Sequence, residues 1–177
     1  MSLPNLVAIP ASLADHAARP GAALRALLDE RGRADDWPAA RWEAFARACV
    51  ASDFVAEQAL RDVEAFLELA DSGQLERPLR PGELRAQLQA LLEDCAQEDE
   101  LARRLRRFRN RQQLRIIWRD ANRLADLGET CRDLSDLADA CIDLAYHWLY
   151  PRHCEQFGTP MGRRSGSPPH LGSLGMG

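Results

Sequence analysis

The arginine side chains between residues 101 and 125 are the densest group in the sequence that could do chemistry. Nine arginines stand there against one acid, Asp120, so the local charge is +8. Guanidinium groups at this density could bind the phosphates of a nucleotide or a nucleic acid. In that interpretation the surface would be formed by the face Arg103–Arg111.

The acids on both sides of this stretch favour a different interpretation. Residues 83–100 and 126–143 each carry a net charge of −5, which together exceeds the charge of the arginines. Asp99–Arg103 and Glu100–Arg104 also have the acid-first spacing of four that stabilises a helix. We therefore favour a solvated, ion-paired face over a phosphate-binding surface.

Cysteine and histidine are the other residues that could ligate a metal or act as a base. The best metal set would be Cys131, His147, His153 and Cys154, but no pair among them has the spacing of a structural zinc site. The cysteines are odd in number, widely spaced and without a CxxC motif, which indicates reduced thiols in a core. They are Cys49, Cys95, Cys131, Cys141 and Cys154. His147 alone is expected on a helix flank rather than as a general base.

Four aspartates recur at intervals of three or four residues between 133 and 143. They are Asp133, Asp136, Asp139 and Asp143. This spacing is typical of the solvated side of an amphipathic helix rather than of paired catalytic carboxylates. The sequence contains no GxSxG, HExxH, Walker A or GxGxxG motif. We predict no catalytic residue and no metal ligand.

The composition predicts helices as the elements that position these side chains. The chain of 177 residues has 28 Ala and 26 Leu, whereas Ile, Val and Thr together number ten. Such a composition favours an all-α fold over a β-rich one. A net charge of −4 with no lysine argues against a generally basic nucleic-acid coat. No apolar run approaches the roughly 20 residues of a membrane span, and the start lacks the features of a secretory signal.

We predict an irregular bundle of about six helices. Pro20 is expected to begin the first helix and Gly32 to end it. Asp36 and Ser52 are the expected N-terminal caps of the second and third helices. Gly73 is expected to end the third helix. Gly128 is expected to end the fifth, with Thr130 and Asp133 as the capping box of the sixth, which Pro151 would end. The predicted ranges are 20–31, 37–50, 53–71, 82–95, 98–127 and 131–150.

The predicted helix 98–127 changes its apolar side at Asn110. Its first half presents Leu101, Leu105 and Phe108. In its second half the apolar side lies about 190° away, at about 100° per residue, and contains Leu114, Ile117, Trp118, Ala121 and Leu124. We expect Trp118 to be buried in a second packing layer. The predicted helix 131–150 has one seam for its neighbours, formed by Leu134, Leu137, Cys141, Leu144 and Trp148.

The order of several segments resembles the N-terminal region of the bifunctional glutamine synthetase adenylyltransferase/adenylyl-removing enzymes. Similarity covers most of residues 50–177 and is strongest between 101 and 160. The segments that carry it are SDFVAE (52–57), LRRFRNRQQLRIIWRD (105–120), LADLGETCRDLSDLADACIDLAYHWLY (124–150), FGTP (157–160) and LGMG (174–177).

The resemblance implies that these helices precede and pack on a nucleotidyltransferase domain. In the family, Leu-Gly-Met-Gly leads into Lys-Leu-Gly-Gly and then to aspartates that hold Mg²⁺. Inorganic phosphate there removes AMP from a tyrosine of glutamine synthetase and gives ADP, and a second such domain adds AMP from ATP. The PII signal protein and glutamine set the balance between the two reactions.

The sequence ends at Gly177, before the lysine and the aspartates of that pattern. We therefore carry over no catalytic residue, and only Gly175 and Gly177 are candidates, at the edge of a nucleotide-binding glycine turn. We expect residues 1–157 to be the helical part of the adenylyl-removing domain. Residues 158–177, with six of the 11 glycines, would be a disordered or incomplete start of the α/β nucleotidyltransferase domain.

The resemblance implies a cytoplasmic helical scaffold that is inactive alone and binds neither Mg²⁺ nor ATP or ADP. Its partners in the full-length family are glutamine synthetase and the PII protein, with no membrane and no nucleic acid. The alternative is a stand-alone helical module that binds an acidic partner or nucleic acid through Arg103–Arg111.

Overall fold

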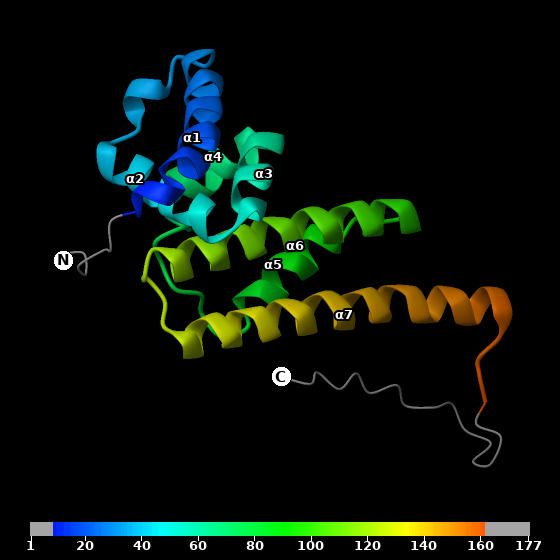
Figure 1. Ribbon diagram of the computed structural model, residues 1–177. Coiled ribbons are helices and arrows are strands. Elements are labelled where there is room, and N and C mark those ends of the chain that lie inside the picture. Colours follow the sequence, from blue (N-terminus) through cyan, green and yellow to red (C-terminus); the bar gives the residue numbers. More distant parts are fainter. Residues whose placement is uncertain (1–8, 162–177) are drawn as a thin grey trace. The chain divides into compact units, whose positions relative to one another are not determined.

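The computed structural model of the chain describes residues 9–161 (Figure 1). The regular structure of this part is entirely helical, which confirms the predicted all-α class for these residues. Its elements are η1 (Ala11–Leu13), α1 (Ala14–Asp29), η2 (Ala34–Asp36), α2 (Ala39–Ala51), α3 (Asp53–Arg61), α4 (Val63–Asp71), α5 (Glu83–Leu92), α6 (Glu98–Ala121) and α7 (Leu127–Phe157).

The chain divides into two compact units. Unit 1 contains the residues up to Pro78 together with 110–132, and unit 2 contains 79–109 together with the residues from Asp133 onward. One border therefore falls within α6, between Arg109 and Asn110. Asn110 is also the residue at which the sequence predicts that the apolar side of this helix changes.

Unit 1 packs its helices around a cluster of aromatic rings. The ring centroid of Phe66 on α4 lies 5.7 Å from that of Trp37, 5.7 Å from Phe45 on α2 and 6.0 Å from Trp118 on α6. Trp118 is 1% exposed, so its predicted burial is confirmed. Tilted ring pairs at these distances contribute beyond the area that they bury, and this cluster joins α2, α4 and the second half of α6.

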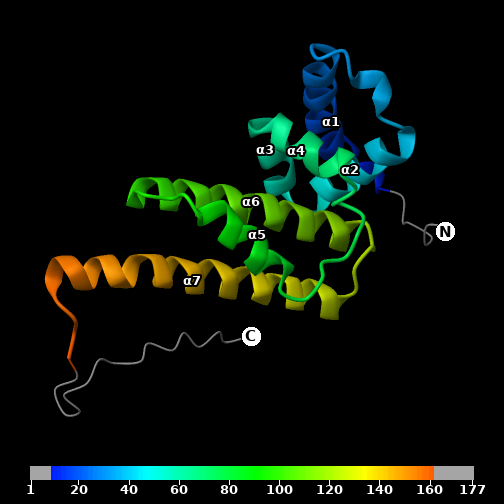
Figure 2. The same cartoon turned by 180° about the vertical axis from the view of Figure 1, so that it is seen from behind.

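Unit 2 contains α5, the first half of α6 and α7 from Asp133, which lie side by side (Figures 1 and 2). Its buried apolar side chains are Leu84, Leu88, Leu92, Cys95, Leu101, Phe108, Leu137 and Ala140. The indole Nε1 of Trp148 on α7 donates a hydrogen bond of 3.1 Å to the carbonyl oxygen of Cys95. This bond fixes α7 to the turn between α5 and α6.

Two of the predicted helix ends are confirmed, and both depend on a glycine. Gly32 has φ +66° and Gly73 has φ +70°, a region that side chains with a Cβ rarely adopt. The amide of Arg33 then donates to the carbonyl of Leu28, and the amide of Gln74 donates to that of Leu69. These bonds satisfy carbonyls that the helix end leaves open.

The prediction that Pro20 and Pro151 bound helices is wrong, because both lie inside helices. The φ that a proline ring fixes is itself helical, but an internal proline removes one backbone hydrogen bond and its ring crowds the carbonyl four residues earlier, so other contacts must offset that cost. Next to Pro151, Arg152 donates 2.9 Å to the carbonyl oxygen of Trp148, and its guanidinium carbon lies 3.7 Å from the centre of the Trp148 ring. These contacts lie within α7 on both sides of the proline.

The predicted helix 53–71 is divided at Asp62. Its backbone there has φ −135° and ψ 72°, and its side chain accepts a hydrogen bond of 3.2 Å from the amide of Ala65. Asp62 therefore ends α3 and caps α4. The caps predicted at Asp36 and Ser52 form no such bond, and Asp36 instead accepts 3.3 Å from Arg33.

The predicted junction of the last two helices is also wrong. α6 ends at Ala121, because Arg123 adopts φ +54° and the amide of Leu124 donates 2.8 Å to the carbonyl of Arg119. Gly128 lies inside α7, whose cap is Asp126: its carboxylate accepts 2.7 Å from the amide of Glu129. The expected capping box of Thr130 and Asp133 therefore lies one turn too late.

Candidate functional site

The nine arginines of residues 101–125 do not form one uniform face. Arg115 and Arg119 are 1% and 2% exposed, whereas Arg103 and Arg106 are exposed. The predicted solvated face is therefore wrong for the buried pair in unit 1. The sequence showed the density of the charge but not that two arginines lie on the same side as Trp118.

The two buried arginines hold the segment that follows α4. Arg115 donates from Nε to the carbonyl oxygen of Gln74 at 2.8 Å and from Nη2 to the carbonyl oxygen of Arg77. Arg119 donates from Nη1 to the carbonyl oxygen of Glu76. A guanidinium has five donors in a fixed plane, so it can satisfy several carbonyls of a loop that has no helix or sheet partner.

Arg119 also reaches the first turn of α7. It donates to the Glu129 carboxylate at 2.9 Å from Nε and 2.7 Å from Nη2, and to the carbonyl oxygen of Leu124 at 2.9 Å. Both side chains of this ion pair are shielded from water, with 2% and 18% exposed. The role of Arg119 is therefore structural: it holds the loop, the end of α6 and the start of α7.

Arg104 in unit 2, which is half-buried, supports the ion-paired interpretation for part of this stretch. It donates 2.5 Å to Glu100, as predicted, and also donates to Asp94. The bond from Arg104 lowers the pKa of the Asp94 carboxyl below its ordinary value. In unit 1, Arg111 pairs with Glu68 at 2.8 Å. In the described part of the chain no ion pair joins Asp99 to Arg103, although their spacing would allow one.

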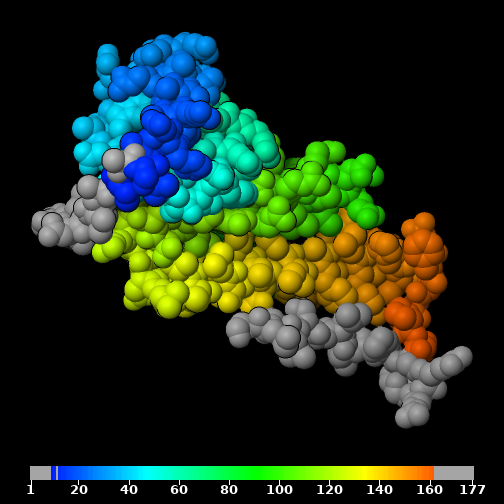
Figure 3. Space-filling model, in the orientation of Figure 1, coloured from blue at the N-terminus to red at the C-terminus, as the bar shows by residue number. Residues whose placement is uncertain are grey.

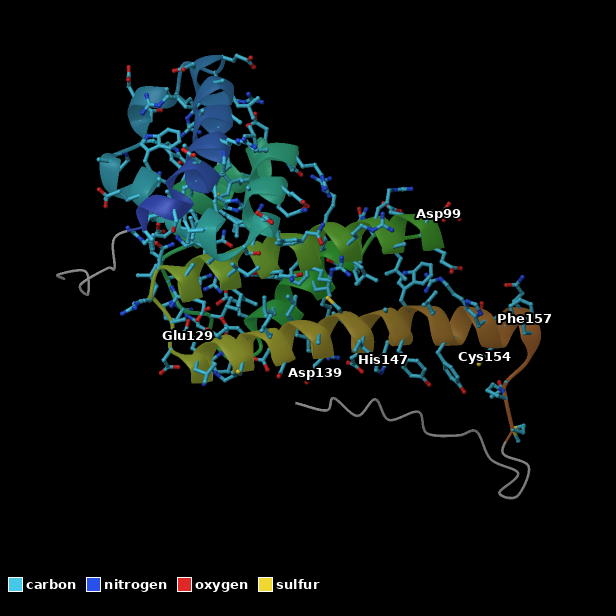
Figure 4. All side chains as sticks on the ribbon, in the orientation of Figure 1. Asp99, Glu129, Asp139, His147, Cys154 and Phe157 are labelled. Atoms are coloured by element: carbon cyan, nitrogen blue, oxygen red, sulfur yellow. The ribbon has the colours of Figure 1, made fainter. Side chains whose placement is uncertain are left out.

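The aspartates of α7 lie in different environments. Asp133 is 6% exposed, so its predicted position on a solvated face is wrong, whereas Asp136 and Asp139 are exposed. Asp143 forms an ion pair with Arg85 of α5 and lies 3.2 Å from Nδ1 of His147. Figure 4 shows Asp139 and His147 on α7.

His147 lies on a helix flank, as predicted. Its Nδ1 is 2.8 Å from the carbonyl oxygen of Asp143, four residues earlier on the same helix, and its side chain is 64% exposed. The seam predicted for this helix is correct at Leu137, which is buried, and wrong at Leu134, which is 44% exposed.

A groove of about 600 Å³ in unit 1 brings together three polar side chains that the sequence did not indicate as one group. His16 of α1 lies 2.8 Å from Asp53 of α3, beside the thiol of Cys49. Burial, with a smaller effect of the Asp53 charge, raises the pKa of Cys49 to about 12. A thiol that keeps its proton at neutral pH is not a nucleophile, so this groove offers no thiol chemistry.

All five cysteines are free thiols, but only Cys49 and Cys95 are buried as expected. Cys131 is exposed. Among residues 9–161 no group of three or more His, Cys, Asp and Glu side chains could hold a metal ion. The described residues therefore offer no set of ligands that fits Mg²⁺. Gly175 and Gly177 lie outside the described residues.

Residues 42–177 match the sequence family described as Glutamate-ammonia ligase adenylyltransferase. The whole chain is 64% identical to a protein of Pseudomonas aeruginosa named Bifunctional glutamine synthetase adenylyltransferase/adenylyl-removing enzyme and 55% identical to the protein of that name from Pseudomonas syringae. Over 81% of the chain it is 41% identical to the one from Thioalkalivibrio sulfidiphilus. The chain belongs to this family.

The chain spans only 18% of the length of the two Pseudomonas adenylyltransferases that match all of it. This membership confirms the resemblance found in the sequence and does not support a stand-alone module that binds through Arg103–Arg111. No solved structure matches the chain. None of the helices in residues 9–161 is long and apolar enough to cross a membrane.

Proposed function

We propose that this chain is the helical scaffold of an enzyme that adds AMP to glutamine synthetase and removes it again. The observation that carries the proposal is the 64% identity over the whole chain to the Pseudomonas aeruginosa adenylyltransferase. The contacts of Arg115 and Arg119 support a scaffold, because these two most buried charged side chains of residues 9–161 are used to hold loops.

We propose that the catalytic chemistry takes place in the part of the enzyme that follows these helices in the longer relatives. Magnesium and the nucleotides ATP and ADP would bind there, since residues 9–161 contain no carboxylate cluster fit for the metal. The partners would be glutamine synthetase and the PII signal protein, and the site of action the cytoplasm. Residues 1–157 would be the helical region, and 158–177 the start of the nucleotidyltransferase domain, with Gly175 and Gly177 at the edge of its glycine turn.

The proposal is tested by incubating adenylylated glutamine synthetase with inorganic phosphate and measuring the ADP released. We expect the 177-residue chain to release none above background, because it would lack the carboxylates that position the metal. The Pseudomonas aeruginosa adenylyltransferase, assayed beside it, is the positive control. Turnover by the chain alone would contradict the assignment as a scaffold.

A further inference from the structure

The groove of about 600 Å³ in unit 1 has a wall of small apolar side chains. Figure 3 shows two of the helices that line it, α1 in blue and α3 in cyan, at the surface of this unit. Its apolar lining residues are Pro20, Ala23, Cys49, Ala56 and Leu60. The Cys49 thiol keeps its proton at neutral pH, because burial raises its pKa to about 12. The wall is therefore uncharged, and the volume lies in the range typical of small-molecule sites.

Four charged or polar side chains complete the lining of this groove. They are Asp15, His16, Arg19 and Asp53, and all four are exposed. His16 and Asp53 form a pair, with Nε2 of the histidine 2.8 Å from the carboxylate. Within residues 9–161 neither the Asp15 carboxylate nor the Arg19 guanidinium forms an ion pair or a hydrogen bond, although their spacing of four would allow one. The apolar wall is therefore flanked by one unpaired anion and one unpaired cation.

A second groove of unit 1 shows how unusual this arrangement is. Its volume is about 540 Å³, and five charged side chains line it. Each of them has an ion-pair partner, in the pairs Arg33–Asp71 at 2.9 Å, Arg111–Glu68 at 2.8 Å and Arg31–Glu64 at 2.7 Å. Those charges neutralise one another within the chain. The charges of Asp15 and Arg19 instead remain available to a ligand that carries one charge of each sign.

The spacing of the two charges indicates the size of such a ligand. Asp15 and Arg19 are four residues apart, which is about 6 Å along α1. The ammonium nitrogen and the carboxylate carbon of an extended dipeptide are also about 6 Å apart, whereas a single amino acid carries both groups on one carbon. We propose that this groove binds a peptide of dipeptide size, with its ammonium group on Asp15, its carboxylate on Arg19 and apolar side chains against Ala23 and Ala56. This inference does not depend on the proposed function.

Titration of the 177-residue chain with the dipeptide Leu-Leu, followed by NMR, tests the inference. We expect amide shifts on α1 and α3 that give a dissociation constant. N-acetyl-Leu-Leu has no ammonium group and Leu-Leu amide has no carboxylate. Each should bind about fivefold more weakly, which corresponds to the loss of one exposed ion pair. Gly-Gly has both charges but no apolar side chain, and should bind at least about tenfold more weakly.

Two variants test whether Asp15 and Arg19 contact the ligand directly. Asp15→Asn should weaken the binding of Leu-Leu about fivefold and leave that of N-acetyl-Leu-Leu unchanged, because the acetylated ligand has no ammonium group to lose. Arg19→Gln should act in the same way on Leu-Leu and Leu-Leu amide. Asp29→Asn is the matched control, because Asp29 is also exposed on α1 but does not line the groove. The NMR spectrum of each variant shows whether it is folded.

Three results would overturn the inference. The first is the absence of shifts on α1 and α3 at millimolar Leu-Leu. The second is an equal loss of Leu-Leu and N-acetyl-Leu-Leu binding in Asp15→Asn, because the carboxylate would then act on the fold and not on the ligand. The third is free leucine binding as tightly as Leu-Leu, which would exclude a ligand of dipeptide size. Glutamine synthetase takes no part in these titrations, so their failure refutes this inference and leaves the proposed function unaffected.

Discussion

Arg115 and Arg103 carry the same charge on the same helix but have different environments. Arg115 is 1% exposed and bonded to the loop after α4, whereas Arg103 faces solvent. The sequence gives the number of arginines and the balance of the flanking acids. It does not show that the loop carbonyls of Gln74, Glu76 and Arg77 accept from Arg115 and Arg119, because only the folded chain brings these groups together.

Replacing Arg119 by methionine should destabilise the chain by about 3 kcal/mol. The change leaves the shielded Glu129 carboxylate without its partner, and a charge left alone in such a site is costly. Arg31→Met is the control, because Arg31 pairs with Glu64 at 2.7 Å where 33% and 72% of the side chains are exposed. It should cost less than about 1 kcal/mol. Urea unfolding measures both, and equal losses would contradict the structural role of Arg119.

The stability of the chain should fall above pH 9 because of Cys49. Burial, and to a lesser extent Asp53, raises the pKa of this thiol from 9.0 to about 12 in the folded chain. Between these values the unfolded thiol has lost its proton and the folded one has not, so the unfolded state gains stability as the pH rises. Unfolding followed from pH 8 to 11 should show the wild type losing stability relative to Cys49→Ala. If the free energies of unfolding of the wild type and Cys49→Ala changed in parallel with pH, the effect assigned to Cys49 would be refuted.

Helices were easier to predict than their ends. Gly32 and Gly73 end helices as expected because a residue without Cβ enters the left-handed region at little cost. Arg123 enters the same region with a Cβ at φ +54°, which no local rule indicates. Pro20 and Pro151 are typical helix ends by local rules, but both lie inside helices, where packing on either side must offset the lost hydrogen bond and the crowding of the ring.

The start of α7 provides a test at the scale of an element. Asp126→Ala should lower the free energy of unfolding by about 1 kcal/mol, because the Asp126 carboxylate accepts a hydrogen bond from the amide of Glu129, which has no partner within the helix. Thr130→Ala should cost less, since its hydroxyl only donates a long bond of 3.3 Å to Asp120. Thermal unfolding compares the two. A larger loss for Thr130→Ala would favour the cap predicted from the sequence. The spacing of Asp126 and Glu129 was the signal for the observed cap.

The site was less predictable than the fold. The sequence correctly indicated helices, the burial of Trp118 and the pair Glu100–Arg104, because each depends on spacing along one helix. The groove at His16, Asp53 and Cys49 joins three helices, and only the folded chain brings such residues together.

At the scale of the whole molecule, the chain has the helices and loop contacts of a scaffold and the family membership of an enzyme. The chain matches 18% of the Pseudomonas aeruginosa adenylyltransferase. A helical scaffold in an enzyme family is expected if this part supports chemistry that other parts of the enzyme carry out. The helices would then be interchangeable between relatives as similar as these two, which are 64% identical over the whole chain.

A chimeric enzyme tests most directly whether these helices act as a scaffold for chemistry elsewhere in the enzyme. The 177 residues replace the aligned part of the Pseudomonas aeruginosa adenylyltransferase. The transfer of AMP to glutamine synthetase and its removal are then assayed. We predict that the chimera performs both reactions at rates within about tenfold of the parent, because the catalytic groups are supplied by the parent. A chimera that folds, as judged by circular dichroism, but performs neither reaction would contradict the account.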